Sequence, residues 1–341
     1  MKKIFSKVLL IICIGILLSG CSQGKITEKM IEEATKTISR PSTSGALWVN
    51  GAYLCDKKNK PIQLRGMSTH GISWFPDYVN QEFFTELANE WNANVVRISM
   101  YTMEYAGYCN GGDREELKAL VKEGIDYATQ ADMYVIVDWH TLSDGNPSAN
   151  VDEAIQFFDE ISALYSDADN VLYEICNEPN GVGWADIREY ALKVIPVIRN
   201  NDKDAVILVG TPNWCQYPSE ISKAPLSEYD NIMYTIHFYA ASHGKNNMEE
   251  INTCMQAGIP LFVSEFGICD SSGSGELDYD TGNEWINMLN KYAISYVQWN
   301  ISNNAESSAA FNEKCSKVSM FTEDDLSDHS KWMKEKMDVE K

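Results

Sequence analysis

The feature that most constrains the fold is a repeated alternation of short apolar runs with longer amphipathic segments. Eight apolar runs occur between residues 62 and 300, at 62–65, 95–100, 134–139, 171–176, 205–210, 233–238, 261–265 and 296–300. Their apolar residues are nearly continuous, which is typical of parallel strands buried on both faces. Helical periodicity occupies the intervals at 82–91, 114–131, 151–165, 184–200, 248–257 and 280–291.

Eight strands that alternate with helices predict an α/β fold of the (β/α)8 TIM-barrel type. A doubly wound sheet is the alternative, but no GxGxxG or GxxxxGK[ST] sequence follows any of the apolar runs. Asn50 and Gly51 lie between apolar flanks ahead of the first run and predict an N-terminal β-hairpin with a two-residue turn. Pro218 and Pro225 predict a poor helix between the fifth and sixth strands.

The first residues have the pattern of an export signal. Lys2, Lys3 and Lys7 precede an apolar stretch at 8–18, which is too short for a comfortable membrane span. The sequence Leu-Ser-Gly-Cys that ends at Cys21 resembles a bacterial lipobox, and this resemblance implies lipidation of Cys21. The alternative is an ordinary signal peptide with a chance cysteine. We therefore expect a secreted lipoprotein on the cell membrane or cell surface. Residues 1–20 would be the signal peptide, residues 21–45 a lipid-anchored tether, and residues 46–341 one barrel domain. Within the tether we expect one helix, over residues 27–38.

The charge and the cysteine pattern exclude several classes of protein. The formal net charge is −21, which disfavours nucleic acid and anionic membranes as partners and favours a neutral one. The chain has nine cysteines, and seven remain when Cys13 and Cys21 in the export signal are set aside. An odd number of cysteines without a CxxC sequence argues against a disulfide framework or a zinc site. The five histidines form neither HxH nor HExxH, and the chain has no GxSxG. We expect no metal, no cofactor and a monomer.

Functional side chains follow seven of the eight predicted strands, and the carboxyl ends of barrel strands converge on one mouth, where active sites lie. Two of these side chains are carboxylates, Glu178 and Glu265. Glycoside hydrolysis needs one carboxylic acid to protonate the leaving oxygen and a second carboxylate to attack the anomeric carbon. A lone glutamate at a strand end would more often be a helix cap or a surface ion partner.

The motifs at these strand ends resemble glycoside hydrolase family 5, and more closely its endoglucanase (cellulase) subfamily than its mannanases. The resemblance extends from about residue 47 to about residue 310 and rests on the segments 64–74, 95–101, 138–140, 173–181, 237–239, 264–267 and 299–302. It implies a retaining endo-β-1,4-glucanase that cleaves internal β-1,4 bonds of cellulose or mixed-linkage β-glucan through a covalent glycosyl-enzyme. The alternative from another class is a glycan-binding protein on a decayed barrel, which would have lost a glutamate first.

The resemblance also implies a role for each motif residue. Glu178 would be the acid/base and Glu265 the nucleophile, Asn177 would bind the sugar 2-hydroxyl, and Arg97 and Tyr239 would keep Glu265 ionised.

The other residues would contact sugars: His140 and His237 in subsite −1, Trp299 as the floor of that subsite, His70 and Trp74 in subsite −2, and Trp214 on the leaving-group side. Trp74 and Trp214 could equally be packing residues. The chain departs from the family pattern at Asn304, where relatives commonly carry a lysine that reaches distal sugars. We expect weaker distal glycone binding there, or a neutral exchange in a solvated loop.

Overall fold

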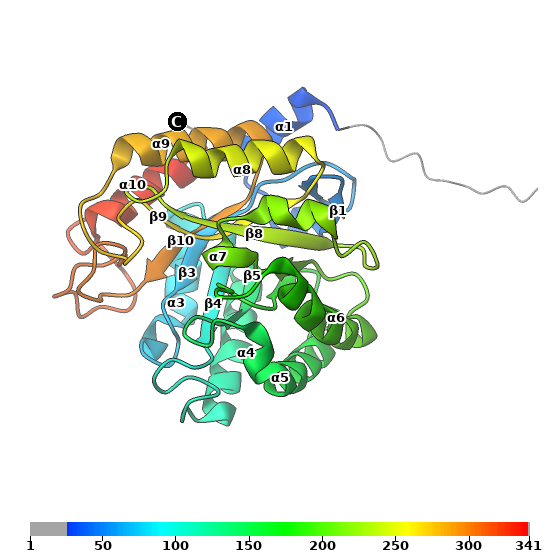
Figure 1. Ribbon diagram of the computed structural model, residues 1–341. Helices are drawn as coiled ribbons and strands as arrows, with labels where there is room; N and C mark the ends of the chain where they lie inside the picture. Colours follow the sequence, from blue (N-terminus) through cyan, green and yellow to red (C-terminus); the bar gives the residue numbers. More distant parts are fainter. Residues whose placement is uncertain (1–25, 340–341) are drawn as a thin grey trace, which may run out of the picture.

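The computed structural model describes residues 26–339, and eight parallel strands in it close into a barrel, which confirms the predicted (β/α)8 fold (Figure 1). The strand order around the barrel is β10-β3-β4-β5-β6-β7-β8-β9. The strands are β3 (Arg65–Thr69), β4 (Val95–Tyr101), β5 (Tyr134–His140), β6 (Val171–Glu174), β7 (Ile207–Val209), β8 (Ile232–Tyr239), β9 (Leu261–Gly267) and β10 (Tyr296–Ile301).

Alternate residues along a strand serve two different cores. Val95 belongs to the cluster that fills the barrel interior, together with Tyr134, Leu208 and Phe262. Val96 is fully buried in the second and larger cluster, between the strands and the helices. Both faces of each strand are thus apolar, which explains why the runs read as continuous rather than alternating.

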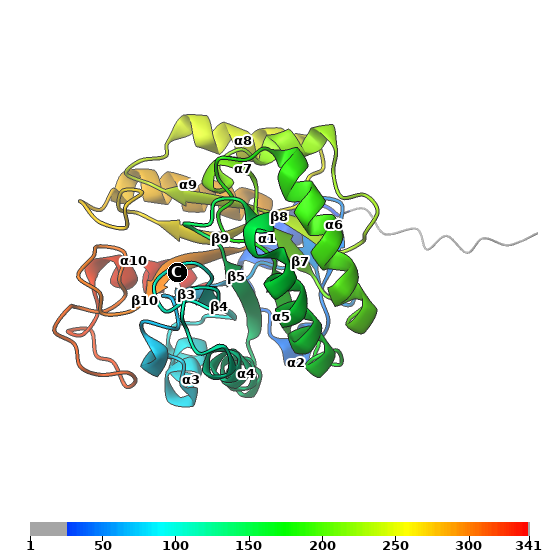
Figure 2. The ribbon, with the colours of Figure 1, turned by 60° about the horizontal axis from the view of Figure 1, so that its bottom comes forward.

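Helices surround the strands (Figure 2). The six predicted helices are present and begin and end within three residues of their expected bounds. Helix α10 was not predicted, and only the short helices α7 and η3 lie between β7 and β8, as the prolines indicated. The helices are α1 (Glu28–Thr35), α2 (Pro41–Ser44), α3 (Gln81–Glu90), α4 (Arg114–Gln130), α5 (Val151–Leu164), α6 (Trp184–Asn201), α7 (Pro212–Cys215), α8 (Lys245–Gln256), α9 (Tyr279–Tyr292) and α10 (Asp328–Met337), with 3-10 turns η1 (Pro76–Tyr78), η2 (Pro147–Asn150) and η3 (Pro218–Lys223).

Two predicted boundaries need correction. The first barrel strand begins at Arg65 rather than residue 62, because Ile62 donates its amide to Leu54 of the hairpin and its side chain plugs the barrel floor. The hairpin comprises β1 (Trp48–Asn50) and β2 (Tyr53–Cys55), and Asn50 pairs with Tyr53. The turn residues are therefore Gly51 and Ala52, one position later than expected. Gly51 has φ +60°, which suits the first central position of a type II′ turn.

The described part of the segment expected to be a tether is packed on the barrel, because helix α1 contacts α9 and Arg65 donates to the Thr35 carbonyl. Cys21 and the predicted signal peptide lie outside the described residues. Within them, helix α1 forms where a helix was expected, but Arg40 donates to the carbonyls of Ala88 and Ala93 at 2.6 Å each. Tyr134 donates its hydroxyl to the Gly45 carbonyl at 2.8 Å. Residues 40–45 therefore belong to the folded domain, because the Arg40 guanidinium supplies donors to otherwise unpaired carbonyls at the end of α3.

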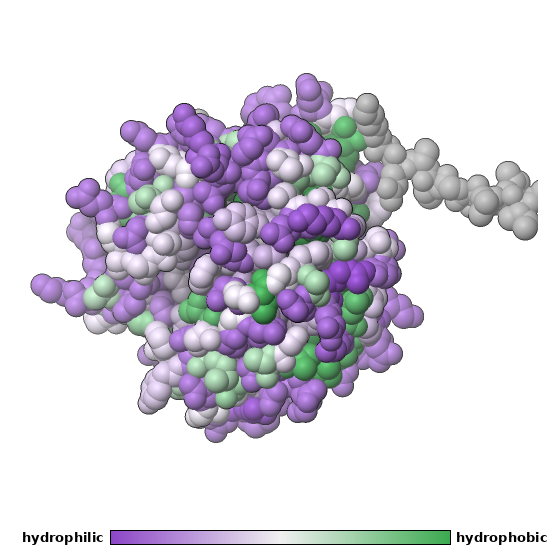
Figure 3. Space-filling view, in the orientation of Figure 1, coloured by the Kyte–Doolittle hydropathy of each residue, from purple (hydrophilic) through white to green (hydrophobic). Residues whose placement is uncertain are grey.

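Most of the face seen in Figure 3 is hydrophilic, in keeping with the acidic composition. No helix in the range 26–339 combines the length and the apolar character that crossing a membrane requires.

We predict that Arg40→Ala lowers the free energy of unfolding by about 1–2 kcal/mol, because it removes two charge-assisted hydrogen bonds. The matched control is Lys36→Ala, which removes an exposed ion pair with Glu32 and should leave the urea midpoint nearly unchanged, because solvent screens the pair. Urea unfolding of the two variants measures the difference. Equal stabilities would show that residues 40–45 are not part of the cooperative unit.

Candidate active site

A pocket of about 530 Å³ opens at the carboxyl ends of the barrel strands. Nine of the eleven residues predicted for the site line it, while Arg97 and Asn177 are fully buried behind its wall. The nine are His70, Trp74, His140, Glu178, Trp214, His237, Tyr239, Glu265 and Trp299. The strand-end pattern thus identified one contiguous site, although it did not distinguish the pocket surface from the layer beneath it.

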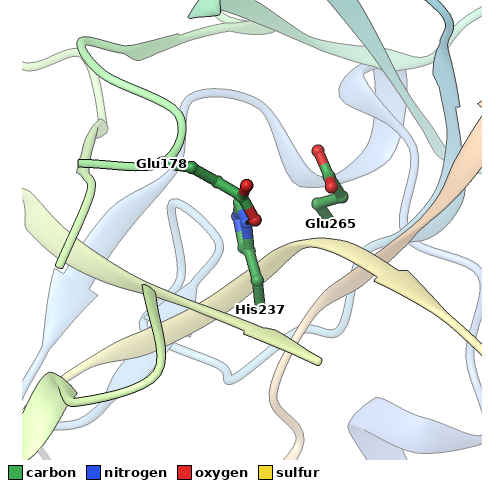
Figure 4. Close-up of side chains that lie close together, drawn as sticks. All are labelled: Glu178, His237 and Glu265. Carbon is green, nitrogen blue, oxygen red and sulfur yellow. Dashed lines mark hydrogen bonds and ion pairs between the residues drawn. The ribbon is translucent and has the colours of Figure 1, made fainter. Parts of the chain in front are cut away.

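Glu178 follows β6, and its carboxyl lies against the imidazole of His237 from β8 (Figure 4). Its Oε1 is 2.9 Å from His237 Nδ1. Burial raises the pKa of Glu178 to about 8, Arg97 opposes this rise, and Glu174 and Asp138 add to it. A carboxyl group that keeps its proton near neutral pH can serve as a general acid.

The direction of the hydrogen bonds behind Glu178 agrees with a protonated carboxyl. Ser264 donates its hydroxyl to Glu174 Oε1 at 2.7 Å, so its oxygen is left to accept from His237 Nε2 at 2.9 Å. Burial lowers the pKa of His237, and a neutral imidazole carries only one N–H. With that proton on Nε2, His237 Nδ1 is an acceptor, and Glu178 is the donor. A four-residue hydrogen-bond relay therefore runs from Glu178 through His237 and Ser264 to Glu174.

Glu265, near the end of β9, has a different environment. Tyr239 donates its hydroxyl to Oε1 at 2.8 Å, and Arg97 Nη1 donates to Oε2 at 3.3 Å. These are the contacts that the sequence assigned to both residues. Burial nevertheless raises the pKa of Glu265, the Glu178 carboxyl adds to the rise, and His237 and Arg97 oppose it. Both of its oxygens accept hydrogen bonds, which suits the charged form of a nucleophile.

Arg97 connects the two halves of the site from below. Its guanidinium lies 3.0 Å from Asp138, 2.8 Å from Glu174 and 3.3 Å from Glu265. Burial alone would lower the pKa of Arg97, but the three carboxylates raise it above its usual value. No role was predicted for Glu174 from the sequence, although an acidic residue within the apolar run at 171–176 indicates a buried carboxylate that needs a partner.

Asn177 and His140 form a second buried pair. Asn177 accepts from Arg97 Nη2 at 2.6 Å and donates to His140 Nε2 and the Thr141 carbonyl at 3.2 Å each. His140 Nδ1 lies 2.6 Å from Asp138, and burial lowers the pKa of His140 well below its usual value. Both amide hydrogens of Asn177 are thus engaged within the protein, and its contact with a sugar hydroxyl stays a prediction.

Aromatic rings cover the pocket floor and its edges. Trp299 stacks on His140 with ring centroids 5.1 Å apart, and Trp74 stacks on His70 at 5.4 Å. Trp74 and Trp214 are each 43 % exposed at the pocket wall, which is more than packing residues in a core would be. The pocket is also lined by residues that were not predicted for the site, namely Tyr101, Glu104, Leu142, Gln216, His243, Ser271, Ser272 and Gly273.

Asn304 lines the pocket too, but its side chain is held. It donates to Glu306 Oε2 at 2.9 Å, and Asn300 and Ser308 donate to Glu306 Oε1 at 2.6 and 2.9 Å. The Asn304 amide thus supports the Glu306 carboxylate.

Glu178, His237 and Glu265 bring three possible metal-ligand atoms within 4.8 Å of one another, a grouping that the sequence spacing did not reveal (Figure 4). Glu178 follows β6, His237 lies on β8 and Glu265 lies on β9, so the three residues come from segments far apart in the chain. Two of the three atoms already share a hydrogen bond, and the Glu265 carboxylate is bound by Tyr239 and Arg97. The chemistry of this donor set fits proton transfer and nucleophilic attack without further groups.

Comparison with known proteins gives a consistent family. The model of the cellulase family, glycosyl hydrolase family 5, matches residues 55–305. Endoglucanase A of Butyrivibrio fibrisolvens is 46 % identical over 85 % of this chain, which covers 68 % of that relative. An endoglucanase of Clostridium saccharobutylicum is 42 % identical over 84 % of this chain, which covers 63 % of its length.

Solved structures of endoglucanases are similar to this chain in fold as well as in sequence. The catalytic domain of Thermobifida fusca endoglucanase Cel5A, in a variant complexed with cellotetraose, superposes with a TM-score of 0.83 and 39 % identity, covering 88 % of this chain and 99 % of that one. With the fold, the paired glutamates and a family match over most of its length, the chain belongs to glycosyl hydrolase family 5, the cellulases.

Proposed function

We propose that this protein is a retaining endo-β-1,4-glucanase. The observation that carries the proposal is the pair of carboxyl groups Glu178 and Glu265, which have oxygens within 4.8 Å of each other. Their hydrogen-bond partners differ: Glu178 lies against His237, whereas Glu265 accepts from Tyr239 and Arg97. Retaining enzymes hold their two carboxyl groups about 5–5.5 Å apart, whereas inverting enzymes leave about 6.5–9.5 Å for a water molecule. The short separation favours direct attack by one carboxylate.

In this mechanism the Glu265 carboxylate attacks the anomeric carbon while Glu178 donates its proton to the glycosidic oxygen. The bond between that oxygen and the anomeric carbon breaks, the leaving chain departs as an alcohol, and an ester joins the sugar to Glu265. Glu178, now ionised, removes a proton from water, and the resulting attack releases the sugar and restores both groups. The negative charge of Glu265 disappears when the ester forms, which makes ionised Glu178 less unfavourable at the moment it must act as a base.

The pocket wall supports a neutral, flat polymer as the substrate. Its described lining residues include four glutamates, Glu104, Glu178, Glu265 and Glu306, but no lysine or arginine, so anionic glycans would be repelled. Exposed rings at Trp74 and Trp214 offer stacking surfaces for successive pyranose units. Cellotetraose in the similar Thermobifida fusca enzyme supports the same choice. A glycan-binding role would not need a matched acid and nucleophile.

We further propose that Cys21 carries a lipid that anchors the protein to the cell membrane or cell surface. The support is the charged and apolar start of the chain, followed by Leu-Ser-Gly-Cys. Diacylglycerol supplies two buried chains, which is enough for stable attachment.

Nucleophile and acid are tested with a 2-deoxy-2-fluoro-cellobiosyl inactivator and with Glu178→Ala. We expect the inactivator to label Glu265, as read by peptide mass spectrometry, and NMR to show the β anomer as the first product. Glu178→Ala should reduce kcat/KM about 10²–10⁴-fold for a phenyl cellobioside but much less for a dinitrophenyl one, whose leaving group needs no proton. The control Glu306→Gln should be labelled at the same residue. Label elsewhere, or an α product, would refute the assignment.

The pH dependence follows from the protonation states. Glu178 must be protonated, and burial raises its pKa to about 8, so kcat/KM for cellotetraose should fall as pH rises through about 8. The same profile for Glu178→Ala with a dinitrophenyl cellobioside should lack this alkaline limb. If the limb persists in the variant, another group titrates there.

Lipidation is tested by Cys21→Ser. We expect wild-type protein in the membrane fraction and the variant in the medium or periplasm, because the two acyl chains are lost. Metabolic labelling with a fatty acid should mark only the wild type, and equal fractionation of the two proteins would disprove lipidation.

A further inference from the structure

The turn that presents Trp214 to the pocket has an unusual backbone. Asn213, Trp214 and Cys215 have φ values of 56°, 54° and 59°, three consecutive left-handed residues that carry a Cβ. Each is disfavoured in this conformation, and such a run persists only where surrounding contacts hold it. The contacts that hold this turn involve the loop that carries Glu178.

One of these contacts is made by the thiol of Cys215, which is fully buried and free of any disulfide. Its Sγ donates to the carbonyl of Asn177 at 3.0 Å and lies 3.0 Å from the hydroxyl of Thr235. The Thr211 amide donates to the sulfur at 3.3 Å. Burial raises the pKa of Cys215 well above its usual value, so the thiol keeps the proton that it donates.

Two further contacts tie the same segments together. The Trp214 amide donates to the Pro179 carbonyl at 3.0 Å. Gly210 leaves no room for a side chain, since a Cβ there would lie 2.5 Å from the Cys176 carbonyl oxygen and 2.6 Å from Pro179. The backbone is therefore fixed on both sides of Glu178, and Thr235 extends the connection to β8, two residues before His237.

We propose that Cys215 is a positioning residue, which sets the carboxyl of Glu178 at the correct place relative to the leaving group that rests on Trp214. The inference rests on the proposed function. Proton transfer requires donor and acceptor within hydrogen-bond reach, and displacement by about 1 Å can cost up to about 10²-fold in rate. Loss of the thiol should therefore impair protonation of the leaving oxygen more than nucleophilic attack by Glu265, which does not contact this turn.

The test compares Cys215→Ala, Cys215→Ser and the matched control Cys254→Ala, a fully buried cysteine in α8 away from the pocket. The measured quantity is kcat/KM, which reports formation of the glycosyl-enzyme, for phenyl and dinitrophenyl cellobiosides. We expect Cys215→Ala to lose tenfold or more on the phenyl substrate and less than threefold on the dinitrophenyl one, with its alkaline limb displaced. Serine should restore most of the loss, since a hydroxyl can replace the donor. Cys254→Ala should change both substrates equally.

Other outcomes are also decisive. Equal losses on the two substrates, or a selective loss in Cys254→Ala, would overturn the positioning role. If Cys215→Ala does not fold, Thr235→Val removes one partner of the same thiol, and an unchanged substrate ratio in that variant overturns the proposal. A wild-type protein that cleaves neither substrate nor cellotetraose would refute the proposed function itself, whereas an active wild type with unaffected Cys215 variants refutes only this inference.

Discussion

The structure around the catalytic pair depends on one buried guanidinium. Arg97 is wholly enclosed, yet it contacts three carboxylates, Asp138, Glu174 and Glu265, and the amide of Asn177. A buried carboxylate is costly unless a partner compensates its charge, and removing one partner of a buried ionic group typically costs about 3–5 kcal/mol. The planar fork of an arginine can address several oxygens in fixed directions, which a lysine ammonium cannot do. The polar layer beneath the pocket is thus a consequence of this residue.

Arg97 also creates the asymmetry on which the proposed chemistry relies. Its guanidinium contacts Glu265 directly, whereas its effect on Glu178 is a Coulomb interaction that opposes the rise in the pKa of that carboxyl. Glu178 instead faces the imidazole of His237, whose pKa is lowered by burial and whose Nδ1 accepts a hydrogen bond from the Glu178 carboxyl. The two carboxyl groups in one pocket therefore have different hydrogen-bond partners, and the proposed chemistry assigns them different protonation states.

The sequence predicted the barrel and most of the pocket because the relevant signals are local. Each strand run is apolar on both faces, and each is followed at once by its functional group, as in Cys176-Asn177-Glu178. The failures arose where the signal was not local. Ile62 is apolar because it plugs the barrel floor, not because it pairs as a barrel strand, so the first strand was placed too early. The segment at 40–45 looked like a linker, since the carbonyls that bind Arg40 lie about 50 residues away in the sequence. The role of Glu174 likewise depends on partners from two other strands, Arg97 on β4 and Ser264 on β9.

The attachment of residues 40–45 and the hairpin has a consequence for orientation. Gly45 binds Tyr134 at the start of β5, and Val49 binds Asn231 just before β8, so both contacts lie at the amino-terminal end of the barrel. The pocket opens at the opposite end. If Cys21 carries the lipid proposed above, this attachment favours an orientation with the closed base of the barrel toward the bilayer and the cleft directed away from it. Long glucan chains could then approach from the surroundings without competing with the membrane for space, and the cleavage products would be released next to the cell.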